Sequence, residues 1–170
     1  MKKLPVSFFS RPALVVAKEL IGTYLVIKRN GVIERYKITE TEAYIGPHDL
    51  ASHSSKGRTA RTEVMYHSPG TIYIYLIYGM YYMLNIVTDE TDYPAAVLIR
   101  GIEGFTGPGK LTKYLGINKT INGKMLGMPT GIWIEKDESA QVPKITRTAR
   151  IGVSYAGPIW SEKKYRFLLQ

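Results

Sequence analysis

The order of apolar and polar positions predicts a chain built mainly of β-strands. Apolar segments rich in β-branched and aromatic residues occur at residues 23–28, 32–43, 71–77, 80–88, 95–100, 132–135 and 149–154. Asn30-Gly31 lies between the first two and is the commonest two-residue hairpin signal. Tyr78-Gly79 separates the third and fourth in the same way. Because consecutive strands adjoin one another, we expect a mainly antiparallel sheet.

Helical spacing is limited to two short segments. The first covers residues 13–21, with Ser10 as the expected N-cap and Pro12 in the first turn. The second covers residues 110–115 and ends at Gly116. Few helices beside an antiparallel sheet predict the α+β class. Loops are predicted at residues 46–61, 117–130 and 136–143.

Composition narrows the class of protein. The 170-residue chain is 45% apolar and only 22% charged, which excludes intrinsic disorder. Cys is absent, which excludes disulfides, thiol nucleophiles and Cys-based metal sites. No apolar run approaches the roughly 20 residues of a membrane helix, and the N-terminus lacks a signal-peptide pattern. We therefore expect one soluble, cytoplasmic domain over residues 1–170, without a membrane partner.

The formal net charge of +9 is unevenly spread along the chain. Residues 104–134 hold four lysines and no acid, and residues 139–161 are also free of acids. The later basic residues are Lys144, Arg147, Arg150, Lys163, Lys164 and Arg166. Such stretches suit a surface that binds a polyanion, because each neutralised phosphate releases counterions. A solvated surface that is merely basic is the alternative.

Residues 64–88 contain six of the 13 tyrosines and no Asp, Glu, Lys or Arg. Side chains along residues 72–77 alternate between two faces of the strand. One face holds Ile72, Ile74 and Leu76, and we assign it to the core. The other face is aromatic and holds Tyr73, Tyr75 and Ile77. The aromatic face suits stacking on nucleic-acid bases, although a half-buried tyrosine-rich sheet would look the same. Tyr78 differs, because an aromatic residue at a hairpin tip suits a wedge between base pairs.

Two carboxylates and one arginine are the candidate catalytic groups. On a strand, Ile38, Glu40, Glu42 and Tyr44 would share one face, with the carboxylates about 7 Å apart. Like charges that close raise a pKa unless a cation relieves them. Arg100, at the end of an apolar strand, can supply that cation. The alternative is that Glu40 and Glu42 lie at a solvated strand end and have no catalytic role. The three histidines, His48, His53 and His67, match no metal-binding pattern, so we expect neither metal nor cofactor.

Several motifs in a fixed order resemble the alkyladenine (3-methyladenine) DNA glycosylase family. They are Glu40-Thr41-Glu42-Ala43-Tyr44-Ile45-Gly46-Pro47, Ala51-Ser52-His53, Gly70-Thr71, Tyr78-Gly79-Met80-Tyr81, Asn85, Leu98-Ile99-Arg100, Gly107-Pro108-Gly109-Lys110-Leu111 and Arg150-Ile151-Gly152-Val153. The likeness extends over almost the whole chain. It implies a single α+β domain with a curved antiparallel sheet and a protruding β-hairpin that inserts into DNA.

The resemblance also implies an activity. These enzymes flip damaged purines out of double-stranded DNA and excise them by hydrolysis, which starts base excision repair. Their substrates include 3-methyladenine, 7-methylguanine, hypoxanthine and ethenoadenine. By motif position, Glu42 resembles the general base, with Arg100 as its partner at the catalytic water. Tyr44, His53 and Tyr75 resemble the residues that form the walls of the base pocket. Asn85 resembles the steric filter of that pocket, and Tyr78 resembles the residue that intercalates into the DNA.

Two alternatives accompany this reading. A non-catalytic nucleic-acid-binding module can share a fold with an enzyme, but such a module does not need Glu42 and Arg100. A glycosylase with lyase activity needs a catalytic amine, and no lysine falls among the matched catalytic positions. We therefore expect a monomeric, nucleoid-associated enzyme that uses water as its nucleophile.

Overall fold

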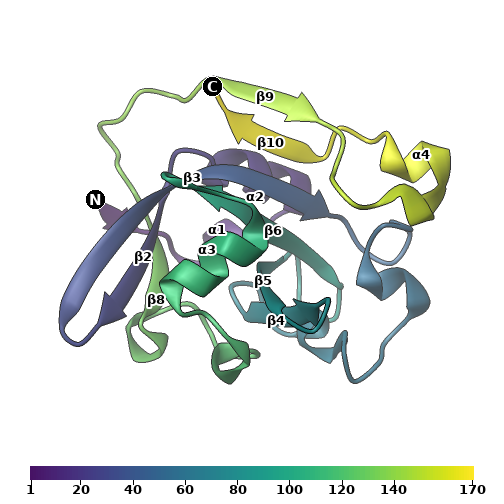
Figure 1. Ribbon diagram of the computed structural model, residues 1–170, viewed down its shortest axis with the longest axis horizontal. Helices are drawn as coiled ribbons and strands as arrows, with labels where there is room; N and C mark the ends of the chain where they lie inside the picture. Colours follow the sequence, from purple (N-terminus) through teal and green to yellow (C-terminus); the bar gives the residue numbers. More distant parts are fainter.

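The computed structural model describes residues 1–170 and contains one connected sheet whose pairings are all antiparallel (Figure 1). Its strands are β1 (Lys2–Lys3), β2 (Tyr24–Arg29), β3 (Val32–Tyr44), β4 (Ile72–Ile77), β5 (Tyr81–Thr88), β6 (Ala95–Ile102), β7 (Phe105–Thr106), β8 (Ile132–Lys136), β9 (Ile145–Thr148) and β10 (Arg166–Leu169). The main path is β1-β8-β2-β3-β6-β5-β4, and β10 joins β3 to β9. The α+β class predicted from the sequence is confirmed.

Short helices cover this sheet. They are α1 (Val6–Phe9), α2 (Ala13–Leu20), α3 (Pro108–Leu115) and α4 (Gly157–Ser161), with 3-10 turns η1 (His53–Lys56), η2 (Glu63–Tyr66), η3 (Lys119–Ile121), η4 (Met128–Thr130) and η5 (Ser154–Ala156). Helix α2 packs against β3 and β6, whereas α3 packs against β5 and β6. The main core is a cluster of 24 buried apolar residues that includes Leu20, Ile99 and Phe167. None of the helices has the length and apolar content needed to span a bilayer.

Both predicted hairpins are present, and their turns have the same backbone form. Asn30-Gly31 connects β2 to β3 with φ of 50° and 81°. Residues 78–80 connect β4 to β5; Tyr78 and Gly79 have φ of 51° and 67°, and the Met80 N–H donates to the Ile77 carbonyl. Two successive positive φ values match the right-handed twist of the strands. Asn tolerates this conformation, whereas a tyrosine is strained in it.

Strand β3 organises the region that holds the candidate site. Residues 32–37 pair with β2, while residues 40–42 lie between β6 on one side and β10 on the other. The register with β6 shifts on both sides of Glu40. As a result, Ile38 lies in the main core together with Ala43, five residues later. The expectation that Ile38 shares a face with Glu40 and Glu42 is wrong, because the irregularity interrupts simple alternation.

Other local expectations also need correction. Ser10 does not cap α2, because it lies at the C-terminal end of α1 and Pro12 precedes α2. Residues 149–154 do not form a strand. Gly152 has φ of 74°, and the Ile151 N–H donates to the Glu42 carboxylate and not to a neighbouring strand. The strands near this segment are β9 and β10 instead, and neither was expected. Leu76 leaves the core face and is 42% exposed near the hairpin tip.

The basic stretches do not all contribute to the surface. Arg150 is buried and forms an ion pair with Asp49, in which neither side chain is exposed. Arg166 is also partly buried and pairs with Glu40. Both therefore belong to internal charge networks, whereas Lys110, Lys113 and Lys119 are exposed. The sequence alone could not separate these groups, because only the fold brings acids to Arg150 and Arg166.

Candidate active site

Glu42 has a completely buried carboxylate that is held from three directions. The Ile151 N–H donates to Oε1 over 2.8 Å, and the Tyr44 hydroxyl donates to Oε2 over 2.9 Å. The Nε of Arg100 lies 3.4 Å from Oε1. Each carboxylate oxygen has two lone pairs, so each retains acceptor capacity for a further donor such as water.

The positions of these groups follow from the strands. Glu42 pairs with Leu98 of β6 and with Arg166 of β10, so it lies in the interior of the sheet. Arg100 comes from β6, two residues beyond Leu98. Ile151 lies in the segment that failed to form a strand, and its N–H binds the Glu42 carboxylate instead of a neighbouring strand. This use of the backbone explains the irregular structure of residues 149–154.

Burial determines the electrostatics of the carboxylate. Desolvation raises the pKa of Glu42, and this effect exceeds the opposing influence of Arg100, the Ile151 N–H and the Tyr44 hydroxyl. Burial and the adjacent Glu42 charge also raise the pKa of Tyr44 well above its ordinary value. Tyr44 therefore stays protonated, and its hydroxyl donates a hydrogen bond to Glu42. A carboxylate with a raised pKa is a better proton acceptor than an ordinary exposed one.

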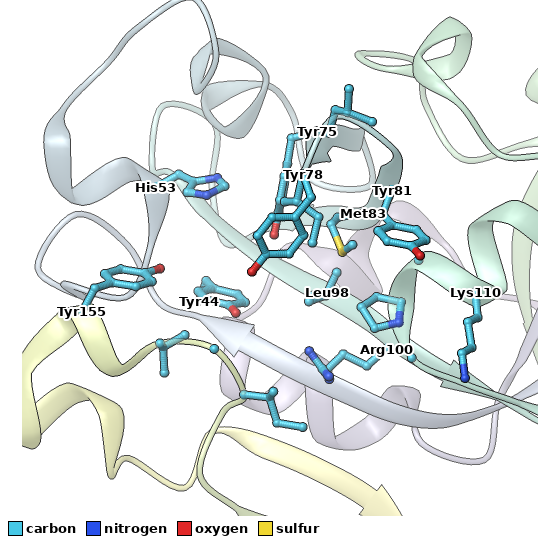
Figure 2. Close-up of a pocket in the computed structure, with 18 of the residues that line it drawn as sticks. Tyr44, His53, Tyr75, Tyr78, Tyr81, Met83, Leu98, Arg100, Lys110 and Tyr155 are labelled. Atoms are coloured by element: carbon cyan, nitrogen blue, oxygen red, sulfur yellow. The ribbon is translucent and has the colours of Figure 1, made fainter.

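A cavity of about 670 Å³ opens beside this group (Figure 2). Tyr44, Arg100 and Ile151 line it, whereas Glu42 itself lies behind them. The opposite side comes from the β4–β5 hairpin and from the start of α3. The volume is ample for a nucleobase and its sugar, and the wall that contains Arg100 and Ile151 adjoins the carboxylate.

Aromatic rings form much of the cavity wall. Figure 2 shows His53 and Tyr75 across the cavity from Tyr44. The His53 and Tyr75 ring centres are 4.5 Å apart in an edge-to-face arrangement, and His53 Nδ1 lies 3.2 Å from the Tyr73 hydroxyl. Burial, followed by the charge of Arg61, lowers the pKa of His53 to about 4. The imidazole is therefore neutral near pH 7 and can contact a flat ligand, even a cationic one, without charge repulsion.

Asn85 lies beneath the aromatic wall instead of lining the main cavity. It is 2% exposed, and its Nδ2 donates to the carbonyls of Tyr73 and Met83 over 3.3 and 3.2 Å. A small void of about 30 Å³ separates it from Tyr44 and His53. The fixed amide therefore limits the depth to which a flat ligand can enter.

Tyr78 occupies the hairpin tip and is 85% exposed. Its ring lies over the mouth of the cavity in Figure 2, and it lines that mouth together with Leu76 and Tyr81. The strained φ of 51° holds a large apolar side chain in water with no packing partner that would stabilise it. The structure thus brings all seven candidate residues to one cavity or its immediate surroundings.

Tyr155 is a wall residue that the sequence reading missed. Its ring lies at the rim of the cavity, and its hydroxyl donates to the Ala51 carbonyl over 2.7 Å. This bond ties the rim to the loop that carries His53. A weak signal is present, because Tyr155 lies two residues after the Arg150-Ile151-Gly152-Val153 motif, but it is about 110 residues from Tyr44 in sequence. Arg61, whose guanidinium lies 5.5 Å from the Tyr75 ring centre, was missed in the same way.

Comparisons with known proteins assign the chain to one family. A family model described as methylpurine-DNA glycosylase matches residues 7–106 and 103–170. A protein of Myxococcus xanthus is 45% identical, over 98% of this chain and 89% of its own length. Proteins of Legionella pneumophila (strain Corby) and Methanocella arvoryzae are each 43% identical, over 100% and 92% of this chain and 96% and 88% of their own lengths. All three have the name “Putative 3-methyladenine DNA glycosylase”.

Proposed function

The chain belongs to the methylpurine-DNA glycosylase family, and from this premise we propose that it flips damaged purines out of duplex DNA and hydrolyses their N-glycosidic bonds. The buried Glu42 carboxylate, held against a cavity with aromatic walls, is the observation that carries the proposal. A binding module would gain nothing from a desolvated acid opposite a polyanion. The non-catalytic alternative is therefore less well supported.

In the proposed reaction, a water bound at the Arg100 and Ile151 wall attacks C1′ of the deoxyribose. Glu42 accepts the proton of this water, and the electron pair of the glycosidic bond leaves with the purine. The transition state resembles an oxocarbenium ion, which the negative carboxylate also stabilises. A cationic alkylated purine leaves as a neutral base, so one carboxylate suffices. A neutral purine such as hypoxanthine needs a proton on the leaving base.

The base would lie between Tyr44 on one side and His53 with Tyr75 on the other. Base–aromatic stacking contributes about 1–3 kcal/mol per base, which offsets the few kcal/mol required to unstack and flip a nucleotide. Tyr78 would fill the space that the flipped nucleotide leaves. We further propose that the enzyme acts as a monomer on the DNA of the nucleoid.

The substrate range that we propose covers alkylated and deaminated purines. Asn85, fixed below the aromatic wall, is placed to exclude the 2-amino group of guanine. We expect Asn85→Ser to increase the release of guanine relative to hypoxanthine by about tenfold, in the range of one lost steric contact. Free bases released from matched duplexes measure this ratio. An unchanged ratio would refute the steric filter.

The decisive experiment uses the purified protein with a duplex that contains one hypoxanthine or one ethenoadenine, in EDTA. Strand cleavage only after heating in alkali would support a hydrolytic enzyme that leaves an intact abasic site. Lys110 is the only lysine that lines the cavity, and it is exposed at the rim. Borohydride should therefore trap no covalent DNA adduct. Release of 3-methyladenine from methylated DNA alone would indicate a narrower substrate range, and no release from any substrate would favour the binding module.

A further inference from the structure

Glu40, the second carboxylate of β3, lies between two arginines and has no contact with the cavity. Its Oε1 accepts a hydrogen bond from Arg100 Nε over 2.9 Å and a shorter one, over 2.5 Å, from Arg166 Nε. The Glu40 side chain is only 9% exposed, and those of Arg100 and Arg166 are 12% and 20% exposed. Three strands, β10, β3 and β6, thus contribute one chain of alternating charge that ends at Glu42.

The backbone around Glu40 is shaped to bring it into this position. The register between β3 and β6 shifts on either side of Glu40, and such irregularities redirect side chains next to active sites. Gly101 faces Glu40 on β6. A Cβ on Gly101 would lie 3.0 Å from the Glu40 Cβ and 3.3 Å from its Oε2. A side chain at position 101 would therefore press on Glu40, and the glycine gives Glu40 room to approach Arg100.

Arg100 is bound more closely by Glu40 than by Glu42, since the Nε distances are 2.9 and 3.4 Å. No other acceptor binds Arg100, so Glu40 fixes the position of its guanidinium. The negative charge of Glu40 also offsets part of the electrostatic effect of Arg100 on Glu42. Arg166 in turn neutralises part of the Glu40 charge. Arg100 can therefore be oriented toward the cavity without becoming the full counter-ion of Glu42.

We propose that Glu40 is a positioning residue of the reaction, which together with Arg166 holds Arg100 and limits the positive charge that reaches Glu42. This inference rests on the proposed glycosylase function and deepens it. Without Glu40, Arg100 and Arg166 would act on Glu42 alone, and the carboxylate would be a weaker base. Without Arg166, the Glu40 charge would act on Arg100 undiminished, and Glu42 would be harder to ionise.

The other groups around Glu42 remain the same in this comparison. They are Tyr44 on β3, Tyr75 on β4, Arg150 with its partner Asp49, and Tyr155 at the rim. Tyr44 donates a hydrogen bond to the carboxylate, and Arg150 is neutralised by Asp49. Substitutions at Glu40 and Arg166 therefore change one balance of charge while the direct hydrogen bonds of Glu42 persist.

The test is the pH profile of single-turnover excision on a duplex that contains one 7-methylguanine. This lesion has a permanent positive charge, so the acidic limb of the profile does not report protonation of the leaving base. We expect Glu40→Gln to move the acidic limb down by about 0.5–1 pH unit and Arg166→Gln to move it up by a similar amount, as one charge at this distance predicts. Glu34→Gln is the control, because it removes the same charge from an exposed ion pair on β3, and its profile should match that of the wild type.

Opposite shifts in the two variants support the proposal. Profiles that coincide with that of the wild type, or that both shift in the same direction, overturn the proposal. A structural disturbance of the sheet would not depend on whether a negative or a positive charge was removed. The melting curve shows whether Glu40→Gln folds. If it does not fold, Arg166→Gln alone is the test, and an acidic limb that does not shift in this variant overturns the proposal. A wild-type protein without excision on any lesion contradicts the proposed function itself, which is a different outcome from coincident profiles.

Discussion

The charged groups around Glu42 and the tip of the β4–β5 hairpin face the same cavity but are built in opposite ways. Glu42 is completely buried, and backbone, hydroxyl and guanidinium donors from separate elements hold it. Tyr78 is 85% exposed and has a strained backbone. One region is held in place by several donors, whereas the other presents an aromatic side chain to solvent.

The difference fits the two roles that we propose for these regions. A proton acceptor must be desolvated and held at one position, because its pKa and its distance to water decide the rate. A side chain that fills a gap in DNA must lie free in solvent until the gap appears. Changes to the charged groups should therefore alter chemistry or folding, and changes at the tip should alter DNA binding. Four predictions test this division.

Glu42→Gln should have the largest effect. Gln has the same shape but cannot accept the proton of the attacking water, so we expect excision to fall by about 10²–10⁴-fold. Binding to a lesion duplex, measured by fluorescence anisotropy, should change by less than a factor of a few. Excision within tenfold of the wild type would remove Glu42 from the mechanism.

Asp49→Asn should be the most destabilising of these changes. It leaves Arg150 buried without its charge partner, and breaking such a pair costs about 3–5 kcal/mol. Urea denaturation measures the loss. Glu63→Gln makes the same exchange in the exposed pair with Arg58 and should have little effect. Similar losses in both variants would contradict the assignment of Arg150 to a structural role.

Tyr78→Asn separates stability from binding. Asn accepts a positive φ, so the melting temperature should not fall. Loss of the ring should weaken binding to lesion duplexes by about 1–3 kcal/mol, with a smaller loss of excision from single-stranded DNA. Val142→Asn exchanges another exposed apolar residue and should leave binding unchanged. Equal losses on duplex and single-stranded substrates would refute the wedge.

His53→Gln should change the pH dependence of stability. The pKa of His53 is about 4 in the folded protein against about 6.5 when unfolded. Between these values the unfolded chain binds more protons, so stability is lost as the pH falls from 6.5 to 4. We expect the melting temperature of the variant to fall less than that of the wild type over this interval. Parallel curves would mean that His53 titrates normally.

Local patterns predicted most strands and both hairpins, because alternation and turn residues act over a few positions. Asn30-Gly31 fixed one turn by its conformational preference. Tyr78-Gly79 was found only by its place between two strands, since tyrosine does not favour such a turn. Residues 149–154 misled the prediction because the Ile151 N–H binds a carboxylate 109 residues away in sequence. No short-range pattern contains that contact.

The sequence by itself determined the α+β class, the family and the residue types available for chemistry, since these depend on local periodicity and on ordered motifs. Only the tertiary structure decided which charges act together. It placed Arg166 and Arg100 on Glu40, hid Arg150 behind Tyr44, and brought Tyr155 to the cavity rim. These outcomes depend on strand pairing across long separations and on burial. Charges have large effects only where the fold removes water from them.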